Sequence, residues 1–153
     1  MLLKPDDQAP DFELSDQNGN TVSLFTFRGK KVLLFFYPKA GTPGWKKQAV
    51  SLRDAGEHLA KLNVAILGIS PDKPNTQKKF DEKNDLGFSL LSDLDHKVAE
   101  QYGVWKREDN FFKKLLGVTR SSFLIDETGK IITLWYKISS LDTVPEALKV
   151  LES

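Results

Sequence analysis

The residues best suited to chemistry lie together in the stretch Pro38-Lys39-Ala40-Gly41-Thr42-Pro43-Gly44-Trp45. A buried strand ending at Tyr37, a loop rich in Pro and Gly, and a helix beginning at Thr42 would aim several backbone N–H groups at one point. Such a point can hold an anion or a thiolate. The residue at that point is Trp45, and the chain contains no cysteine, which excludes disulfides, thiolate metal sites and thiol catalysis.

The elements that would position this stretch follow from the spacing of apolar residues. Residues 32–36 are a continuous apolar run that is too short for a helix, and they predict a central strand covered on both faces. Thr42 is a good N-cap and Pro43 a good first residue for the helix that follows. Residues 64–70 predict a second buried strand, so the unit is a right-handed βαβ. The helix shows apolar residues in steps of four and three, at Trp45, Ala49, Leu52, Gly56, Leu59 and Leu62.

The remaining elements complete an α/β pattern. In chain order they are a β-hairpin of residues 9–14 and 21–24, a helix at 74–86, a strand at 88–91, a helix at 95–102, a charged loop at 106–114, a second hairpin of 121–126 and 130–136, and a final helix from 142. This order predicts a thioredoxin-like mixed sheet flanked by helices, with an added N-terminal β-hairpin, in one domain over residues 1–153.

Composition excludes several classes of partner. The chain is 40% hydrophobic and 28% charged, with 22 basic and 21 acidic residues, so no strong field favours nucleic acid or membrane. No apolar run reaches about 18 residues, and the first residues lack a signal peptide, which predicts a cytoplasmic protein. His58 and His96 stand alone on predicted helices without metal-ligand spacing. We therefore expect two surface histidines, no metal and no cofactor.

Eight motifs, in order over essentially the whole chain, resemble one family. The resemblance is to the bacterioferritin-comigratory, or Q-type, peroxiredoxins of the AhpC/TSA group in the thioredoxin-like superfamily. The motifs are Ala9-Pro10-Asp11-Phe12, Arg28-Gly29-Lys30, Phe35-Phe36-Tyr37-Pro38-Lys39, Thr42-Pro43-Gly44, Leu52-Arg53-Asp54, Gly68-Ile69-Ser70, Leu91-Ser92-Asp93 and Arg120-Ser121-Ser122-Phe123-Leu124-Ile125-Asp126.

The resemblance implies a hydroperoxide substrate, a thioredoxin-like reductant and a set of site residues. The family's Pro-x-x-x-Thr-x-x-Cys motif falls on Pro38, Thr42 and Trp45, where Trp45 occupies the position of the peroxidatic cysteine. The position of the resolving cysteine, five residues later, is Val50. Arg120 corresponds to the active-site arginine. Both sulfur atoms are therefore missing from this chain.

Physical chemistry agrees with these implied roles. A helix N-terminus and the charge of Arg120 would together lower a thiol pKa and stabilise the thiolate. Thr42 would then bind the peroxide, and Pro38 would keep water off the sulfur. Each residue also has a structural interpretation, since Thr42 is an ordinary helix cap and an arginine at a strand edge is usually a surface or salt-bridge residue.

Trp45 cannot perform the family's reaction, because an indole neither attacks the peroxide O–O bond nor cycles as a thiol does. We expect a chain without peroxidase activity, and an engineered or mutated variant rather than a natural relative that lacks the cysteine. A buried indole would overpack a pocket shaped for a thiol by about 1–3 kcal/mol, unless the first helical turn shifts or the ring points outward.

Two other functions stay open at this point. The scaffold could bind partners or self-associate through an exposed aromatic patch of Trp45, Trp105, Phe111 and Phe112. We expect a monomer, with a weak dimer through Trp45, Phe111 and Phe112 as the alternative. Amine catalysis by Lys46 is a third hypothesis, because a helix N-terminus and an apolar neighbour would lower its pKa.

Overall fold

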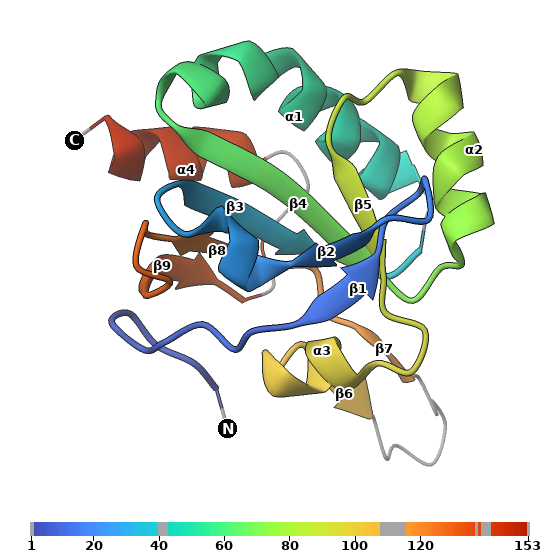
Figure 1. The fold of residues 1–153 in the computed structure, drawn as a ribbon, viewed down its shortest axis with the longest axis horizontal. Coiled ribbons are helices and arrows are strands. Elements are labelled where there is room, and N and C mark those ends of the chain that lie inside the picture. The colour runs from blue at the N-terminus through green and yellow to red at the C-terminus, as the bar shows by residue number, and fades with distance from the viewer. Residues whose placement is uncertain (1, 40–42, 108–115, 137, 139–141, 153) are drawn as a thin grey trace.

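A seven-stranded mixed sheet forms the centre of the protein, with strand order β2-β1-β5-β4-β3-β8-β9 (Figure 1). The structure is a computed structural model that describes residues 2–39, 43–107, 116–136, 138 and 142–152. Its elements are β1 Glu13–Ser15, β2 Thr21–Ser23, the 3-10 helix η1 Leu24–Phe27, β3 Lys31–Phe36, α1 Pro43–Lys61, β4 Val64–Ser70, α2 Pro74–Asn84, β5 Ser89–Ser92, α3 Lys97–Gln101, β6 Trp105–Arg107, β7 Leu116–Val118, β8 Ser121–Ile125, β9 Ile131–Trp135 and α4 Thr143–Leu151.

The predicted βαβ unit is present at the centre of this sheet. Strands β3 and β4 pair in parallel from Lys31 opposite Val64 to Phe36 opposite Ile69, with α1 between them in the chain. The N–H of Tyr37 donates to the carbonyl of Ile69 at 3.0 Å and extends the pairing by one residue. Because parallel strands end at the same edge of a sheet, the loop before α1 leaves the sheet beside the end of β4.

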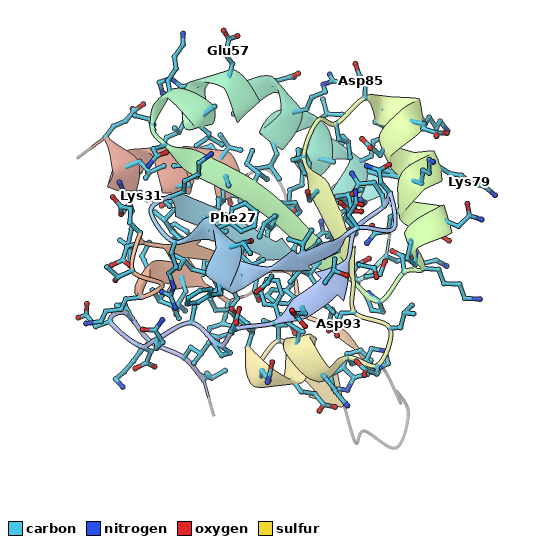
Figure 2. The ribbon with its side chains drawn as sticks, in the orientation of Figure 1. Phe27, Lys31, Glu57, Lys79, Asp85 and Asp93 are labelled. Atoms are coloured by element: carbon cyan, nitrogen blue, oxygen red, sulfur yellow. The ribbon has the colours of Figure 1, made fainter. Side chains whose placement is uncertain are left out.

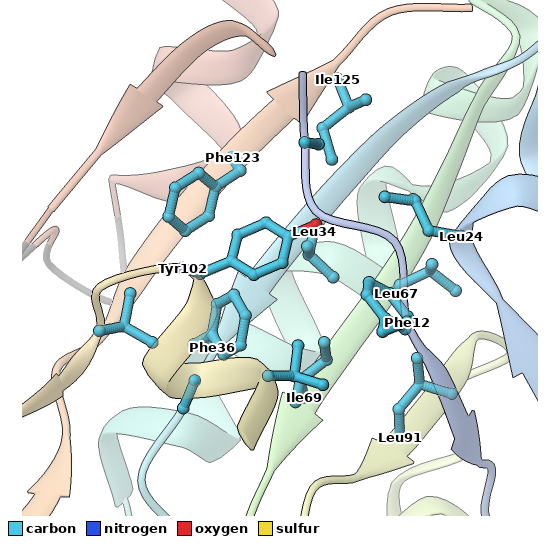
Figure 3. Packing of buried hydrophobic residues seen from close by; sticks show 14 of the residues in the cluster. Phe12, Leu24, Leu34, Phe36, Leu67, Ile69, Leu91, Tyr102, Phe123 and Ile125 are labelled. Carbon is cyan, nitrogen blue, oxygen red and sulfur yellow. The ribbon is translucent and has the colours of Figure 1, made fainter. Parts of the chain in front are cut away.

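Alternate residues of β3 face two separate cores, as expected for a strand covered on both sides. Leu33 and Phe35 belong to the core that contains residues of α1, α2 and α4. Leu34 and Phe36 face the other core, where the segment before β1 and Tyr102, just after α3, cover the sheet (Figure 3). The apolar run is therefore continuous because neither face of this strand meets water.

Both predicted hairpins are confirmed, and so is the fold class. Strands β1 and β2 pair around a turn in which Gly19 has a φ of 81°, and β1 also joins the sheet through Ser15 opposite Ser92. Strands β8 and β9 form the second hairpin, with an irregularity in register between Leu124 and Ile125. The N-terminal hairpin thus extends an α/β sheet of the thioredoxin-like type.

The prediction of a loop over residues 106–114 is wrong at its beginning. Residues 106 and 107 belong to β6, which pairs antiparallel with β7, and Trp105 lies opposite Val118 in this pair. The charged residues of this segment are typical of a loop. The strand depends on its pairing with β7, and the sequence of β6 alone does not show that pairing. Residues 108–115 lie outside the described part. Among the residues described, no helix is long and apolar enough to cross a membrane.

Candidate functional site

The first turn of α1 lies where the sequence placed the site. Tyr37 is buried at the end of β3, whereas Pro38 is exposed, and α1 begins at Pro43. The predicted order of strand, loop and helix is therefore present. Thr42, predicted as the cap and as a peroxide-binding residue, lies outside the described residues. Pro38 is thus exposed directly after Tyr37, and its predicted role of keeping water from the site stays a prediction.

The indole of Trp45 is completely buried. It stacks on the ring of Tyr37, with centroids 3.7 Å apart and an interplanar angle of 5°. Phe35 lies 5.1 Å away and Phe80, from α2, lies 5.7 Å away by ring centroids. The outward orientation considered from the sequence is therefore wrong. Burial of a large apolar ring between three aromatic neighbours is favourable, and this explains why the indole points into the core.

This burial also corrects the aromatic-patch prediction. Trp45 has no exposed surface and cannot contribute to a patch or to a weak dimer. Trp105 is half-buried and stacks on His96 with ring centroids 3.7 Å apart. Phe111 and Phe112, the other members of the predicted patch, lie outside the described residues. The described residues thus give no support for self-association through Trp45.

The packing around Trp45 leaves one donor without a partner. Its Nε1 is buried, and no described residue accepts a hydrogen bond from it. Leaving such a group unpaired costs about 1–3 kcal/mol. The neighbouring phenol is satisfied, since the Tyr37 hydroxyl donates to Oε1 of Gln77, and Nε2 of Gln77 donates to the Leu91 carbonyl at 2.9 Å. Burial raises the pKa of Tyr37 far above its usual value, so the phenol is neutral.

Arg120 lies on the other side of the same helical turn. Its Nη1 donates to Oε1 of Gln48 at 3.3 Å. Gln48 is fully buried, and its Nε2 donates to Oγ1 of Thr143 at 2.8 Å, whose Oγ1 is 3.2 Å from Oγ of Ser122. Burial lowers the pKa of the Arg120 guanidinium. A polar chain therefore runs from Arg120 through α1 to α4 and β8.

Gly44 allows Arg120 to lie against the start of α1. A Cβ atom at Gly44 would lie 3.2 Å from Nη2 of Arg120, which is closer than most real Cβ contacts. The guanidinium thus adds a full positive charge to the positive end of a 19-residue helix. Two positive groups at one point stabilise an anion or a thiolate between them. The resemblance implied a position of this kind for Arg120, and its role toward a thiolate stays a prediction.

Comparisons with known proteins decide the family of the chain. The sequence profile of the AhpC/TSA family matches residues 5–133. The chain belongs to the AhpC/TSA family. It is 44% identical over 152 residues to Peroxiredoxin Bcp of Bacillus subtilis, covering 99% of this chain and 97% of that protein. It is 52% identical over 129 residues to Peroxiredoxin Bcp of Escherichia coli, covering 84% and 83%.

A solved structure agrees with this assignment to the AhpC/TSA family. Peroxidoxin BcpB from Mycobacterium tuberculosis superposes with a TM-score of 0.89 at 36% identity, covering 98% of this chain and 97% of that one. The resemblance to the bacterioferritin-comigratory peroxiredoxins is confirmed. Since this member of the family has no cysteine, it lacks the thiol on which a peroxiredoxin reaction depends.

Val50 is half-buried on α1, five residues after Trp45. In an ideal helix, positions five apart point roughly 140° away from each other and have Cα atoms about 8.6 Å apart. A disulfide needs Cα atoms within about 7 Å. The folded helix therefore does not bring the positions of Trp45 and Val50 together, and cysteines placed there could pair only after α1 unwinds locally.

The lysine and the histidines of the sequence predictions are not part of the buried packing around Trp45. Lys46 is exposed, so it lacks the apolar surroundings that amine catalysis requires. His58 is exposed and lies 2.5 Å from Oε1 of Glu152, as expected for a surface residue. His96 is half-buried under Trp105 rather than fully on the surface. Among the described residues, no group of three or more His, Cys, Asp or Glu could hold a metal.

Three residues of the site were missed from the sequence: Gln48, Gly44 and Tyr37. Gln48 had a signal, because it is a polar residue between Trp45 and Ala49 on the apolar face of α1, and a buried polar group needs partners. Gly44 had only the weak signal of a glycine inside a helix start. Tyr37 was treated as the end of a strand, and its stacking on Trp45 depends on where the helix places the indole.

Proposed function

We propose that this chain is a peroxiredoxin scaffold whose peroxidase reaction is absent because Trp45 occupies the place of the nucleophile. Arg120, Thr42 and Pro38 are proposed as the remaining residues of that site, and Val50 as the position of the lost resolving residue. One observation carries the proposal. A fully buried indole fills the first turn of α1 in a chain without cysteine, beside an arginine held against the same turn.

The reaction that is missing requires a thiolate at position 45. Its sulfur would attack one peroxide oxygen, the O–O bond would break, and the other oxygen would leave and take a proton as an alcohol or water. An external dithiol would reduce the sulfenic acid back to the thiol, with the dithiol oxidised to a disulfide and the sulfenic oxygen released as water. Arg120 and the N-terminus of α1 would favour the thiolate and stabilise negative charge on the leaving oxygen.

Four features of this proposal stay predictions. They are a hydroperoxide substrate, a thioredoxin-like reductant, a monomeric state and a cytoplasmic location. The engineered origin of Trp45 and Val50 is likewise a prediction. The family membership supports a peroxide substrate and a thiol reductant for an active form.

Restoring the sulfur tests the proposal. The chain itself should consume no hydroperoxide beyond the buffer rate in the presence of dithiothreitol. Trp45→Cys should consume hydroperoxide with this thiol. Trp45→Ser should not, because serine has nearly the shape of cysteine but carries no sulfur. Adding Val50→Cys should produce an intramolecular disulfide after oxidation, detected as the loss of two free thiols. Rates are measured from the disappearance of cumene hydroperoxide.

Folding has to be measured beside activity, because Trp45→Cys and Trp45→Ser both empty the space between Tyr37 and Phe80. Thermal unfolding of both variants shows whether they are folded at the assay temperature. In the Trp45→Cys background, Arg120→Met should raise the pKa of the new thiol and slow the reaction. A folded Trp45→Cys protein without hydroperoxide reduction would overturn the proposal.

A further inference from the structure

The C-terminal helix reaches the polar side of the site through Thr143. Helices α4 and α1 cover the same face of the sheet (Figure 1). Thr143 is the first residue of α4 and is fully buried, and its Oγ1 lies 2.8 Å from Nε2 of Gln48, 95 positions earlier in the chain. Glu57 projects outward from α1 in Figure 2, and nine residues of helix, about two and a half turns, separate it from Gln48. The bond therefore joins α4 to the buried face of α1.

The chemistry of the groups fixes the direction of each hydrogen bond. A guanidinium has donors only, so Arg120 can face only the carbonyl end of the Gln48 amide, whose Oε1 lies 3.3 Å from Nη1. The NH2 end of the same amide then points at Thr143, where a hydroxyl oxygen accepts. The Thr143 proton can go to Oγ of Ser122, 3.2 Å away and fully buried on β8. The two ends of the amide therefore have different partners, and a reversed amide would put N–H groups against N–H groups.

The position of the Arg120 guanidinium depends on this amide. Nη2 of Arg120 lies 3.2 Å from the place that a Cβ at Gly44 would take, so the charge stands against the first turn of α1. Arginine and glutamine are long side chains with many rotamers, and holding either in one place requires partners at fixed positions. Gln48 meets this condition at its NH2 end, because a buried N–H that leaves the Thr143 hydroxyl would be unpaired. Thr143 thus anchors the far end of the group that Arg120 contacts.

We propose that Thr143 is a positioning residue for Arg120 and acts through the amide of Gln48. The hydroxyl holds the amide, the amide carbonyl holds the guanidinium, and the guanidinium stays at the N-terminus of α1. The placement of Arg120 is a property of the chain as it stands, whereas its effect on a thiol at position 45 rests on the proposed function. The C-terminal helix, which supplied none of the site residues expected from the sequence, is thereby part of the site.

The dynamics of the Arg120 side chain test the proposal in the chain itself. Relaxation of the arginine Nε–H groups is measured in the ¹⁵N-labelled protein, and Arg120→Lys identifies the Arg120 resonance. Thr143→Val keeps nearly the shape of threonine and removes the hydroxyl. The Arg120 order parameter should fall below about 0.6, the range of flexible groups, in this variant, whereas Thr143→Ser should keep the value of the original chain. An unchanged order parameter in Thr143→Val overturns the proposal.

Val144→Ala is the matched control, because Val144 follows Thr143 in α4 and is buried in the core that contains residues of α1. Removing its methyl groups loosens the packing of α4 and should lower the thermal midpoint of unfolding, but it leaves the hydroxyl in place. The Arg120 order parameter should therefore stay that of the original chain. An equal fall in Val144→Ala and Thr143→Val would assign the effect to packing and contradict the positioning role.

A second variant covers the case in which Thr143→Val does not fold. Ser122→Ala then takes its place, since it removes the partner of the Thr143 hydroxyl on β8 and leaves that hydroxyl free to turn. The Arg120 order parameter should fall in the same direction. An unchanged value in folded Ser122→Ala counts against the proposal as it does in Thr143→Val.

The thiol of Trp45→Cys gives a further measurement. A fixed guanidinium beside the start of α1 favours the thiolate, so adding Thr143→Val should raise the pKa of this thiol by about one unit, and adding Thr143→Ser should not. The pKa comes from the ultraviolet absorbance of the thiolate against pH, and equal values with and without Thr143→Val would refute the positioning role. A Trp45→Cys protein that fails to reduce hydroperoxide overturns the proposed function alone, because the order parameter and the thiol pKa are measured without peroxide.

Discussion

The first two turns of α1 contact two different neighbourhoods. On one side Trp45 lies in an aromatic cluster with Tyr37, Phe35 and Phe80, and its only polar atom is buried without a described partner. On the other side, a chain of hydrogen bonds links Arg120 and Gln48 to Thr143 and Ser122. One side of the helix start is packed like a core, and the other like a binding site.

The difference shows how a reaction can be lost while much of its surroundings persists. Under the proposed function, the indole of Trp45 makes apolar core of the side that would carry the nucleophile in an active peroxiredoxin. The polar side is held by bonds within the protein, because Arg120 donates to Gln48 and Gln48 donates to Thr143. Electrostatic residues of a site therefore persist when they are also part of a buried network, since removing them would leave unpaired groups.

The largest expected loss of stability comes from deleting the indole of Trp45 from the aromatic cluster. Trp45→Ala should lower the free energy of unfolding by about 3–5 kcal/mol, because a fully buried ring is deleted. Trp45→Phe should lower it by much less, since it keeps stacking with Tyr37 and removes the unpaired N–H. Both values come from urea denaturation followed by circular dichroism. Equal losses in the two variants would contradict the role assigned to the stack.

The second test interrupts the polar side. Gln48→Leu should lower the free energy of unfolding by about 1–3 kcal/mol, because Arg120 and Thr143 each lose a partner. Gln48→Glu is the matched control, since its carboxylate can accept hydrogen bonds from both neighbours. Denaturation curves should place this variant above Gln48→Leu in stability. A Gln48→Leu protein as stable as the original chain would mean that the network contributes nothing.

The smallest effect concerns the alkaline limit of stability. The pKa of Tyr37 is raised by burial, so above pH 10.0 the unfolded chain releases this proton before the folded one does. Stability should therefore fall as the pH rises above the unfolded pKa, by about 1 kcal/mol per pH unit for one such group. Tyr37→Phe should make this decline shallower while keeping the ring stack. Denaturation midpoints between pH 9 and pH 11 give the slope, and an unchanged slope would contradict the assignment.

Sequence patterns predicted the central elements because local and long-range preferences agree there. The apolar run that forms β3 is covered on both faces, and the Asn-Gly turn of the first hairpin is fixed by local geometry at Gly19. The short strand β6 was missed because its partner, β7, follows it by eight residues outside the described part, and no local preference marks Lys106 as extended.

The candidate site was predicted only in part, since side-chain direction is not encoded in spacing. The family motif placed Trp45 and Arg120 at one helix start, and the structure agrees. The motif could not show that the indole turns toward α2. Tyr37 and Phe80 lie 43 positions apart in the chain, and both pack against Trp45 only in the folded protein. The role of Gln48 required knowing that Thr143 packs beside it.

The buried stack of Trp45 also has an optical consequence. Trp105 and Trp135 are half-buried, whereas Trp45 is shielded from water and lies against a neutral phenol. A quencher dissolved in water therefore reaches the first two indoles before the third, and the emission that resists it comes from Trp45. Quenching of the Trp45 emission would therefore report local opening of the first turn of α1, at the position where the resemblance to the peroxiredoxins places the reactive sulfur.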